Sequence, residues 1–158
     1  MSHQYPKDRT KILIAQLKDA GLKATLPRMQ LSELLLTFVG PFTADEVLHK
    51  VDESGLHIHR ATIYRDLAHF VEAGVLRTFA IRTNTAHYYE LISDSHHHHF
   101  VCENCMKITD VYPNEVEEAL EMFEAALRQQ GLEVDAHTLK FYGRCRTCST
   151  RKERHALV

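Results

Sequence analysis

Apolar residues recur at intervals of three and four positions in four stretches of the first 74 residues. This spacing places them on one face of a helix, so each stretch predicts an amphipathic helix. Thr25 precedes the second stretch, with Pro27 in its first turn, and Thr43 and Glu46 form a capping-box pattern before the third. Glycines follow the stretches and end them. We therefore expect helices at residues 8–20, 26–38, 44–51 and 61–73.

Beyond Gly74 the pattern changes to short runs rich in β-branched and aromatic residues. Residues 75–81 and 86–92 are such runs, and the polar segment 82–85 between them predicts a hairpin. Three short helices, a fourth helix that ends in glycine and a hairpin follow one another in a winged helix-turn-helix. Another small α+β domain is the alternative, but the compact spacing favours the winged form.

The polar segment 93–95 predicts a hinge between two domains. After it we expect strands at residues 98–102 and 107–112, then a helix of about 17 residues that ends near Gly131. Two more strands are expected at residues 132–134 and 138–142. The chain thus reads as α+β, with a winged helix-turn-helix domain at 1–92 and a small α/β domain at 96–158. A unit this small buries little core, so it should need a staple, a partner or both.

Composition and charge narrow the class of protein. Of the 158 residues, 44% are hydrophobic and 25% are charged, which fits folded domains rather than disorder. Residues 1–84 carry a net charge of +2 and residues 85–158 one of −4, so the first domain is the better suited to approach a polyanion. No apolar stretch approaches the ~20 residues of a membrane span, and the polar N-terminus has no signal-peptide core. We expect a cytoplasmic protein without a membrane segment.

Two CxxC pairs, Cys102 with Cys105 and Cys145 with Cys148, are separated by 39 residues. Each pair holds two thiolates in a knuckle, and two knuckles supply the tetrahedral four-thiolate shell that suits Zn²⁺. Disulfides are the alternative, but a reducing cytoplasm disfavours them, and a redox CxxC explains only one pair. The spacing predicts a structural zinc site.

Four consecutive histidines, His96 to His99, lead into the strand expected to end at Cys102. Side chains alternate along a strand, so His97 and His99 share one face and His96 and His98 the other. A purification tag or a solvated patch is the alternative, but the run is internal and adjoins a cysteine pair. We expect two metal half-sites of two imidazoles each.

Carboxylates elsewhere are expected to complete both half-sites. Glu90 ends the second hairpin strand, just across the hinge from His97 and His99. Mixed imidazole and carboxylate ligands suit Fe²⁺, Mn²⁺ or Zn²⁺, and ligand type alone does not select among them. The ligands expected at the second site are His96, His98, His137 and either Glu117 or Glu121.

In these features the sequence resembles the ferric uptake regulator family of bacterial metal-dependent repressors. The likeness covers nearly the whole chain, and the joint occurrence of its motifs in this order is highly specific. They are Ala-Gly-Leu-Lys-Ala-Thr-Leu-Pro-Arg at 20–28, Ala-Thr-Ile-Tyr-Arg at 61–65 with Glu-Ala-Gly-Val at 72–75, the histidines before the first CxxC, and Tyr-Gly-Arg-Cys at 142–145.

The resemblance implies a homodimer that binds double-stranded DNA at an A/T-rich inverted repeat and represses transcription. It makes residues 61–73 the recognition helix and the second domain the dimerisation domain. Thr62, Tyr64 and Arg65 would reach bases or backbone, and Lys23 and Arg28 would hold phosphates. This agrees with the general division in which phosphate contacts position a protein and a helix in the major groove reads sequence.

The family's iron sensors place a histidine after the second helix, a glutamate at the end of the wing strand and two alternate histidines before the first cysteine. Glu90, His97 and His99 match the last three positions, but Gly40, Pro41 and Phe42 stand where the first histidine is expected. At the family's second site, His96 and His137 match the expected histidines. His98 stands where the family commonly has an aspartate.

The same residues bear on the signal that is sensed. Zinc sensors of the family often add a cysteine near the wing strand, which this sequence lacks. Peroxide sensors use aspartates with the histidines, and Asp110 is suitably spaced. Glu90 favours an iron-responsive regulator with Fe²⁺ or Mn²⁺ as the regulatory ion; peroxide, manganese or zinc sensing is the alternative.

Two other classes of protein explain the sequence less well. The zinc-enzyme motifs HExxH and HxE with PCxxC are absent, and four thiolates leave no open position for a catalytic water, so we expect no enzyme. A zinc-ribbon interaction module would leave the helices and hairpin of the first 90 residues unexplained.

Overall fold

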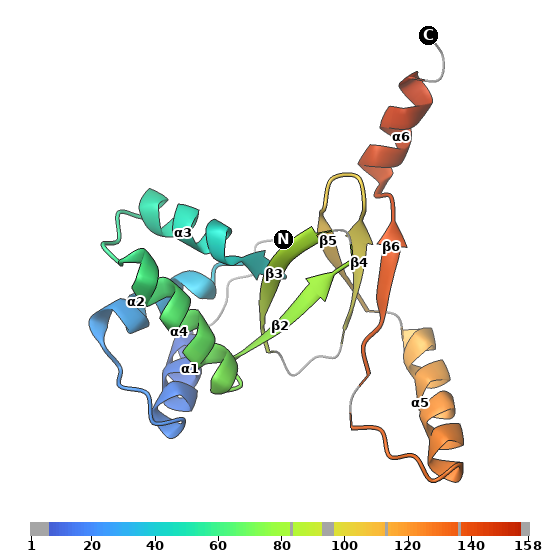
Figure 1. The fold of residues 1–158 in the computed structure, drawn as a ribbon, viewed down its shortest axis with the longest axis horizontal. Helices are drawn as coiled ribbons and strands as arrows, with labels where there is room; N and C mark the ends of the chain where they lie inside the picture. Colours follow the sequence, from blue (N-terminus) through green and yellow to red (C-terminus); the bar gives the residue numbers. More distant parts are fainter. Residues whose placement is uncertain (1–6, 83, 93–96, 113, 136, 156–158) are drawn as a thin grey trace. The chain divides into compact units, whose positions relative to one another are not determined.

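The computed structural model describes residues 7–82, 84–92, 97–112, 114–135 and 137–155 (Figure 1). Two compact units divide the chain, Met1–Ser93 and Asp94–Val158. The expected hinge, residues 93–95, lies outside the described residues. None of the described helices has the length and apolar character that a membrane crossing requires.

The first unit begins with helices that share one hydrophobic core. They are α1 (Lys7–Asp19), α2 (Leu26–Leu35), α3 (Ala44–Glu53) and α4 (Arg60–Glu72). Leu31, Val47 and Leu67 are fully buried in this core, and burying a side chain of this size contributes ~1.5–3 kcal/mol. Helix α1 likewise buries Leu13 and Leu17, although Ile12 is 56% exposed.

Side-chain capping explains where α3 begins. Thr43 Oγ1 accepts a hydrogen bond from the Glu46 amide at 3.2 Å, and the Thr43 amide donates to Glu46 Oε2 at 2.6 Å. This is the expected capping box of α3. Thr25 stands at the N-cap of α2 but makes no side-chain capping bond. The helix ends at Leu35 rather than at the predicted Phe38.

A three-stranded antiparallel sheet completes the described part of the first unit. Its strands are β1 (Phe42–Thr43), β2 (Leu76–Ile81) and β3 (Asn84–Leu91), in the order β1-β3-β2. Gly74, with a φ of 67°, makes the turn between α4 and β2, a conformation that glycine adopts without strain. Helices followed by a two-stranded wing form a winged helix-turn-helix (Figure 1).

The second unit is a small α/β domain built around one central strand. Its elements are β4 (His98–Cys102), β5 (Ile108–Val111), α5 (Asn114–Gln129), β6 (Lys140–Gly143) and α6 (Arg146–His155). The sheet order is β5-β4-β6, in which β4 pairs antiparallel with β5 and parallel with β6. The predicted strand at residues 132–134 is wrong, since these residues form no strand. Instead α6, which was not predicted, follows β6.

The second unit has little core of its own. Among its described residues, the hydrophobic side chains that are buried are Val101 and Cys102, both in β4. The limited core agrees with the expectation that this unit needs a staple or a partner. We therefore expect the stability of this unit to depend on the cysteines and histidines around β4.

Candidate metal centres and nucleic-acid interface

The parallel pairing of β4 and β6 brings the two CxxC pairs together. Cys102, the last residue of β4, is in register with Gly143 at the end of β6, so the second pair follows directly beside the first. The four Sγ atoms lie within 4.8 Å of one another, and those of Cys105 and Cys145 are 3.9 Å apart. Zn–S bonds of ~2.3 Å in a tetrahedron separate sulfurs by about 3.8 Å. The four-cysteine cluster, which includes Cys148, therefore fits Zn²⁺.

The surroundings of these thiols also favour a cation. The backbone amide of Cys145 donates to Cys102 Sγ at 3.3 Å, and this bond is the main reason why the pKa of Cys102 is lowered to about 6. The pKa of Cys148 is raised to about 11: a hydrogen bond with Asn104 lowers it, but contact with the Cys145 thiol and burial outweigh that effect. One thiolate forms readily and a neighbouring one does not, so a divalent cation is needed to ionise the whole set.

The turn of the first knuckle is strained. Met106 has a φ of 60° and donates its amide to the Cys102 carbonyl at 2.8 Å. A left-handed conformation costs a non-glycine residue ~1–2 kcal/mol. The turn places Cys105 back beside Cys102, which indicates that the ligand geometry is maintained against this cost.

His97 and His99 form a second cluster with a carboxylate of the neighbouring strand. Their rings pack edge to face with centroids 5.2 Å apart. His99 is the cross-strand partner of Asp110, with Nε2 and Oδ1 3.7 Å apart. Ligand atoms of all three residues lie within 4.8 Å of one another, and both histidines are at most 9% exposed. Two imidazoles and a carboxylate suit a divalent transition metal.

Glu90 is a buried carboxylate of the wing. It lies in β3 with 4% of its surface exposed. Arg77 on the paired strand β2 donates from Nε to Glu90 Oε2 at 2.7 Å, and its Nη2 is also 2.7 Å away. A buried carboxylate needs such a cationic partner. Glu90 is thus held as an ionised group at the end of the wing.

A third cluster occupies the side of β4 that faces α5. His98 is 2% exposed, and its Nε2 lies 2.8 Å from Glu117 Oε1. The His98 and His137 rings have centroids 5.7 Å apart, and the ligand atoms of these two histidines and Glu117 lie within 4.8 Å of one another. Glu121 is exposed and belongs to no such cluster. His96 lies outside the described residues.

Glu124 is a residue of this region that sequence reasoning missed. Its Oε1 lies 2.8 Å from His137 Nδ1. Glu124 follows Glu117 by seven residues on α5, which is about two helical turns and therefore the same face. That spacing was the signal available in the sequence.

Helix α4, the expected recognition helix, carries most of the residues that were predicted to contact DNA. Tyr64 is 40% exposed, Arg65 is exposed and Thr62 is half-buried. Lys23 is exposed in the segment before α2. The first turn of α4 contains no acidic residue, so the positive end of the helix dipole is open to an anion.

Arg60 is a second residue that the sequence analysis missed. Its Nη2 donates to the Tyr64 hydroxyl at 3.1 Å, and its guanidinium lies 5.5 Å from the centre of the Tyr64 ring. It also approaches Asp45 Oδ1 at 3.6 Å. The i, i+4 spacing of Arg60 and Tyr64 on a helix was the available signal. Arg60 therefore adds a positive charge at the start of α4.

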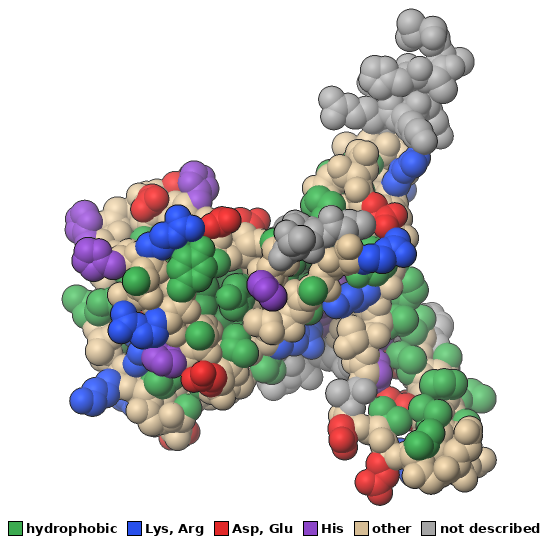
Figure 2. Space-filling model, viewed as in Figure 1, with side chains coloured by type: hydrophobic (Ala, Val, Ile, Leu, Met, Phe, Trp, Pro, Cys, Tyr) green, Lys and Arg blue, Asp and Glu red, His purple; other side chains and the backbone are tan. Residues whose placement is uncertain are grey.

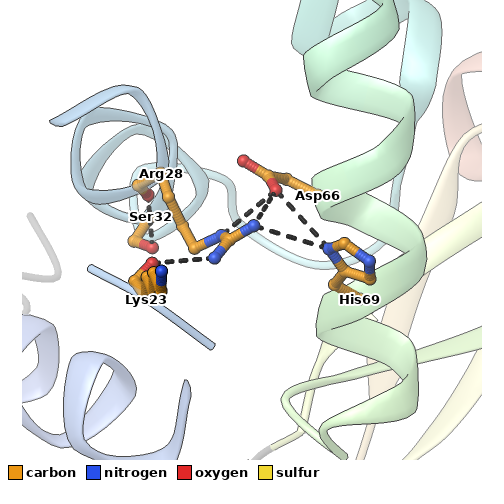
Figure 3. Close-up of polar contacts among 5 residues, drawn as sticks. All are labelled: Lys23, Arg28, Ser32, Asp66 and His69. Atoms are coloured by element: carbon orange, nitrogen blue, oxygen red, sulfur yellow. Dashed lines mark hydrogen bonds and ion pairs between the residues drawn. The ribbon is translucent and has the colours of Figure 1, made fainter. Parts of the chain in front are cut away.

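Arg28, which was expected to hold a phosphate, makes an ion pair inside the first unit. Figure 3 shows its guanidinium between α2 and α4, with Nε and Nη2 donating to Asp66 Oδ1 at 3.1 and 2.6 Å. Nη1 donates to the Lys23 carbonyl at 2.7 Å, and His69 Nδ1 lies 3.5 Å from Nη2. The Arg28 side chain is 12% exposed and that of Asp66 is 4% exposed. The structure thus assigns Arg28 to an internal ion pair.

Comparison with known proteins assigns the chain to a family. The family model described as the ferric uptake regulator family matches residues 19–142. The chain is 37% identical over 142 residues to the ferric uptake regulation protein of Neisseria meningitidis serogroup A, a match that covers 89% of this chain and 96% of that protein. It is 30% identical over 145 residues to the peroxide operon regulator of Bacillus subtilis, with 92% and 96% covered.

Among solved structures, the ferric uptake regulator of Vibrio cholerae superposes with a TM-score of 0.71 at 30% identity, covering 83% of this chain and 98% of that one. Fold, motif order and sequence identity over most of the chain therefore agree. The chain belongs to the ferric uptake regulator family of metal-responsive transcriptional regulators.

Proposed function

We propose that this protein is a homodimeric repressor that binds an A/T-rich inverted repeat of DNA when Fe²⁺ or Mn²⁺ occupies a regulatory site. The observation that carries the proposal is the cluster of the buried His97 and His99 with the half-buried Asp110 of the paired strand β5. Their nitrogen and oxygen donors are those that these two ions accept. We propose a cytoplasmic regulator and not an enzyme, because the four-thiolate shell leaves no position for a substrate or water.

Glu90 is the ligand that we propose from the wing. Support comes from its place at the end of β3 and from its ionised, buried state beside Arg77. A ligand on each side of residues 93–95 would couple the wing to the second unit. The filled site then selects the conformations in which two winged helices of a dimer stand ~34 Å apart, one turn of DNA. It shifts that equilibrium only by its differential affinity for them.

DNA contact is proposed for α4 and the segment before α2. The exposed side chains of Tyr64 and Arg65, with Thr62, support base or backbone contact in the major groove. Lys23 is proposed to hold a phosphate, and its carbonyl fixes Arg28 at 2.7 Å. In this arrangement Arg28 positions the binding helices instead of touching the nucleic acid.

Exposed apolar side chains of the second unit support dimerisation. Met122 and Phe123 on α5 are 75% and 62% exposed, and Phe141 on β6 is 39% exposed. Figure 2 shows hydrophobic side chains gathered over α5. Covering such side chains with a second copy of the chain removes apolar surface from water.

The four cysteines would hold Zn²⁺ within each copy of the chain. His98, Glu117 and His137 would hold a further ion, and His96 is a proposed ligand of the same ion.

The test measures DNA affinity with and without the regulatory ion. Fluorescence anisotropy with an A/T-rich inverted repeat, carried out without oxygen, should show binding that Mn²⁺ or Fe²⁺ strengthens at least tenfold. His99→Ala should remove this stimulation and leave the zinc content unchanged. His49→Ala is the matched control, because His49 is a 76% exposed histidine on α3. Stimulation that survives in His99→Ala would refute the assignment.

Peroxide sensing is the second candidate function, and Asp110 is the observation that favours it. An aspartate beside His97 and His99 is the feature that the sequence analysis associated with peroxide sensors. Hydrogen peroxide oxidises Fe²⁺ but leaves Mn²⁺ intact under mild conditions. Brief peroxide treatment should therefore remove DNA binding from the Fe²⁺ form only. The two functions differ in recovery: an iron regulator regains full DNA binding once Fe²⁺ is replenished, and a peroxide sensor does not.

A further inference from the structure

The contact between Glu124 and His137 lies at the edge of the cluster formed by His98, Glu117 and His137. Glu124 Oε1 and His137 Nδ1 are 2.8 Å apart, and the two side chains are 28% and 27% exposed. Glu124 is not among the residues whose ligand atoms lie within 4.8 Å of one another there. It therefore touches one ligand of the cluster without belonging to it.

The chemistry of this contact fixes which nitrogen of His137 carries a proton. An ionised carboxylate only accepts hydrogen bonds, so Nδ1 is the donor and bears the hydrogen. In a neutral imidazole the other nitrogen, Nε2, then carries no hydrogen and has a lone pair that can bind a metal. A metal-binding histidine usually has its second nitrogen held in this way by a carboxylate or carbonyl, which sets its tautomer, its orientation and its basicity.

The geometry of α5 separates the two glutamates by role. Glu117 and Glu124 are seven residues apart, so they lie on the same helix face about 10 Å apart along the axis. Glu117 reaches His98 at 2.8 Å, and Glu124 reaches His137 at the same distance. Each of the two carboxylates thus contacts a different histidine. Of the two, Glu117 is the one whose oxygen lies within 4.8 Å of ligand atoms of both His98 and His137.

We propose that Glu124 is a positioning residue of the second metal site, which holds His137 through Nδ1 so that Nε2 is the atom presented to the ion. This inference rests on the proposed function, since it assumes that His98, Glu117 and His137 bind a metal. Glu124 itself is not a ligand. Its effect reaches the ion only through the orientation and tautomer of His137.

The first measurement needs no ion in this site. Long-range ¹H–¹⁵N NMR spectra of the zinc-loaded full chain, with other metals removed, report the tautomer of His137 directly. The wild type should show the Nδ1–H form. Glu124→Ala should show a mixture with the Nε2–H form, and Glu124→Gln should keep the Nδ1–H form because its amide oxygen still accepts. Glu121→Ala, an exposed glutamate on the same helix, is the matched control.

The second measurement is metal affinity. Titration with Co²⁺, whose visible absorption reports its coordination, is done in a His99→Ala background so that the regulatory cluster does not contribute. Glu124→Ala should weaken binding by ~10–100-fold, and Glu121→Ala should leave it unchanged. Thermal unfolding should be the same in both variants, because a merely structural role for Glu124 would move the melting temperature instead.

The outcomes separate the inference from the function beneath it. Wild-type tautomer and wild-type Co²⁺ affinity in Glu124→Ala overturn the positioning role alone. Absence of a Co²⁺ site in the His99→Ala background overturns the second metal site and the positioning role with it. A tautomer change accompanied by weaker binding in Glu124→Ala, with both unchanged in Glu121→Ala, supports the proposal.

Discussion

Replacing Arg28 by alanine should destabilise the first unit and leave the number of phosphate contacts unchanged. Its guanidinium donates twice to Asp66 and once to the Lys23 carbonyl, at 2.6 to 3.1 Å. The Asp66 side chain is 4% exposed, and His69 Nδ1 lies 3.7 Å from its Oδ1. The variant therefore leaves a buried carboxylate without its main partner.

The size of the effect follows from burial. Removing one member of a buried ion pair costs ~3–5 kcal/mol, because the other charge stays desolvated. At the lower value, the melting temperature of a domain of this size falls by more than ~10 °C. Replacing both members by apolar residues, Arg28→Met with Asp66→Leu, should recover most of the loss, since attraction and desolvation disappear together.

Calorimetric unfolding of the full chain measures this prediction, and the salt dependence of DNA binding tests the alternative. Glu53→Ala is the control, because it breaks an exposed pair with His49 that should contribute less than ~1 kcal/mol. The reasoning is refuted by an Arg28→Ala protein with unchanged unfolding and a salt slope shallower by about one per protomer. That result would put the guanidinium on a phosphate, as the sequence analysis expected.

Three further predictions concern zinc and DNA. Cys148→Ser should lose zinc and unfold the second unit, because a structural site supplies ~10 kcal/mol or more; one zinc per chain with native circular dichroism would contradict this. Since the pKa of Cys102 is lowered to about 6, its thiolate is present at pH 7.5 and is lost only as the pH falls through 6. Zinc uptake by the metal-free chain at pH 7.5 should then release fewer than four protons, measured by calorimetry in buffers of different ionisation enthalpy, and four would show that Cys102 is not ionised beforehand. Arg65→Ala should relax sequence preference by ~1–3 kcal/mol at one base position, whereas Lys23→Ala should weaken binding to all sequences and flatten the salt slope; equal losses on specific and random DNA for Arg65→Ala would make it a phosphate contact.

Periodicity predicted the elements that bury an apolar face and missed those that do not. The four helices of the first unit and the wing have such faces. The strand β1 has two residues, too few for any period to be visible. The helix α6 has a polar sequence without an apolar stripe, so no hydrophobic period marks it. Residues 132–134 have β-type composition but no partner strand.

Ligand spacing in the sequence was informative for the four cysteines, because a doubled CxxC has few other uses. It was not informative for Glu117 and Glu121, since residues four apart share a helix face and only the position of His98 distinguishes them. Arg28 shows a different limit. An arginine in a basic segment looks the same whether it faces solvent or a buried aspartate 38 residues away, and sequence alone does not reveal the partner.

The short strand β4 connects three sets of ligands. Cys102 ends it, His99 faces Asp110, and His98 faces Glu117. Fixing the backbone of a strand costs ~1–2 kcal/mol per residue, and whichever ion binds first bears that cost for the others. Occupancy of each set should thus raise affinity at the remaining two, and linkage makes the factor reciprocal. A cell short of zinc would consequently need more of the regulatory metal to achieve the same repression.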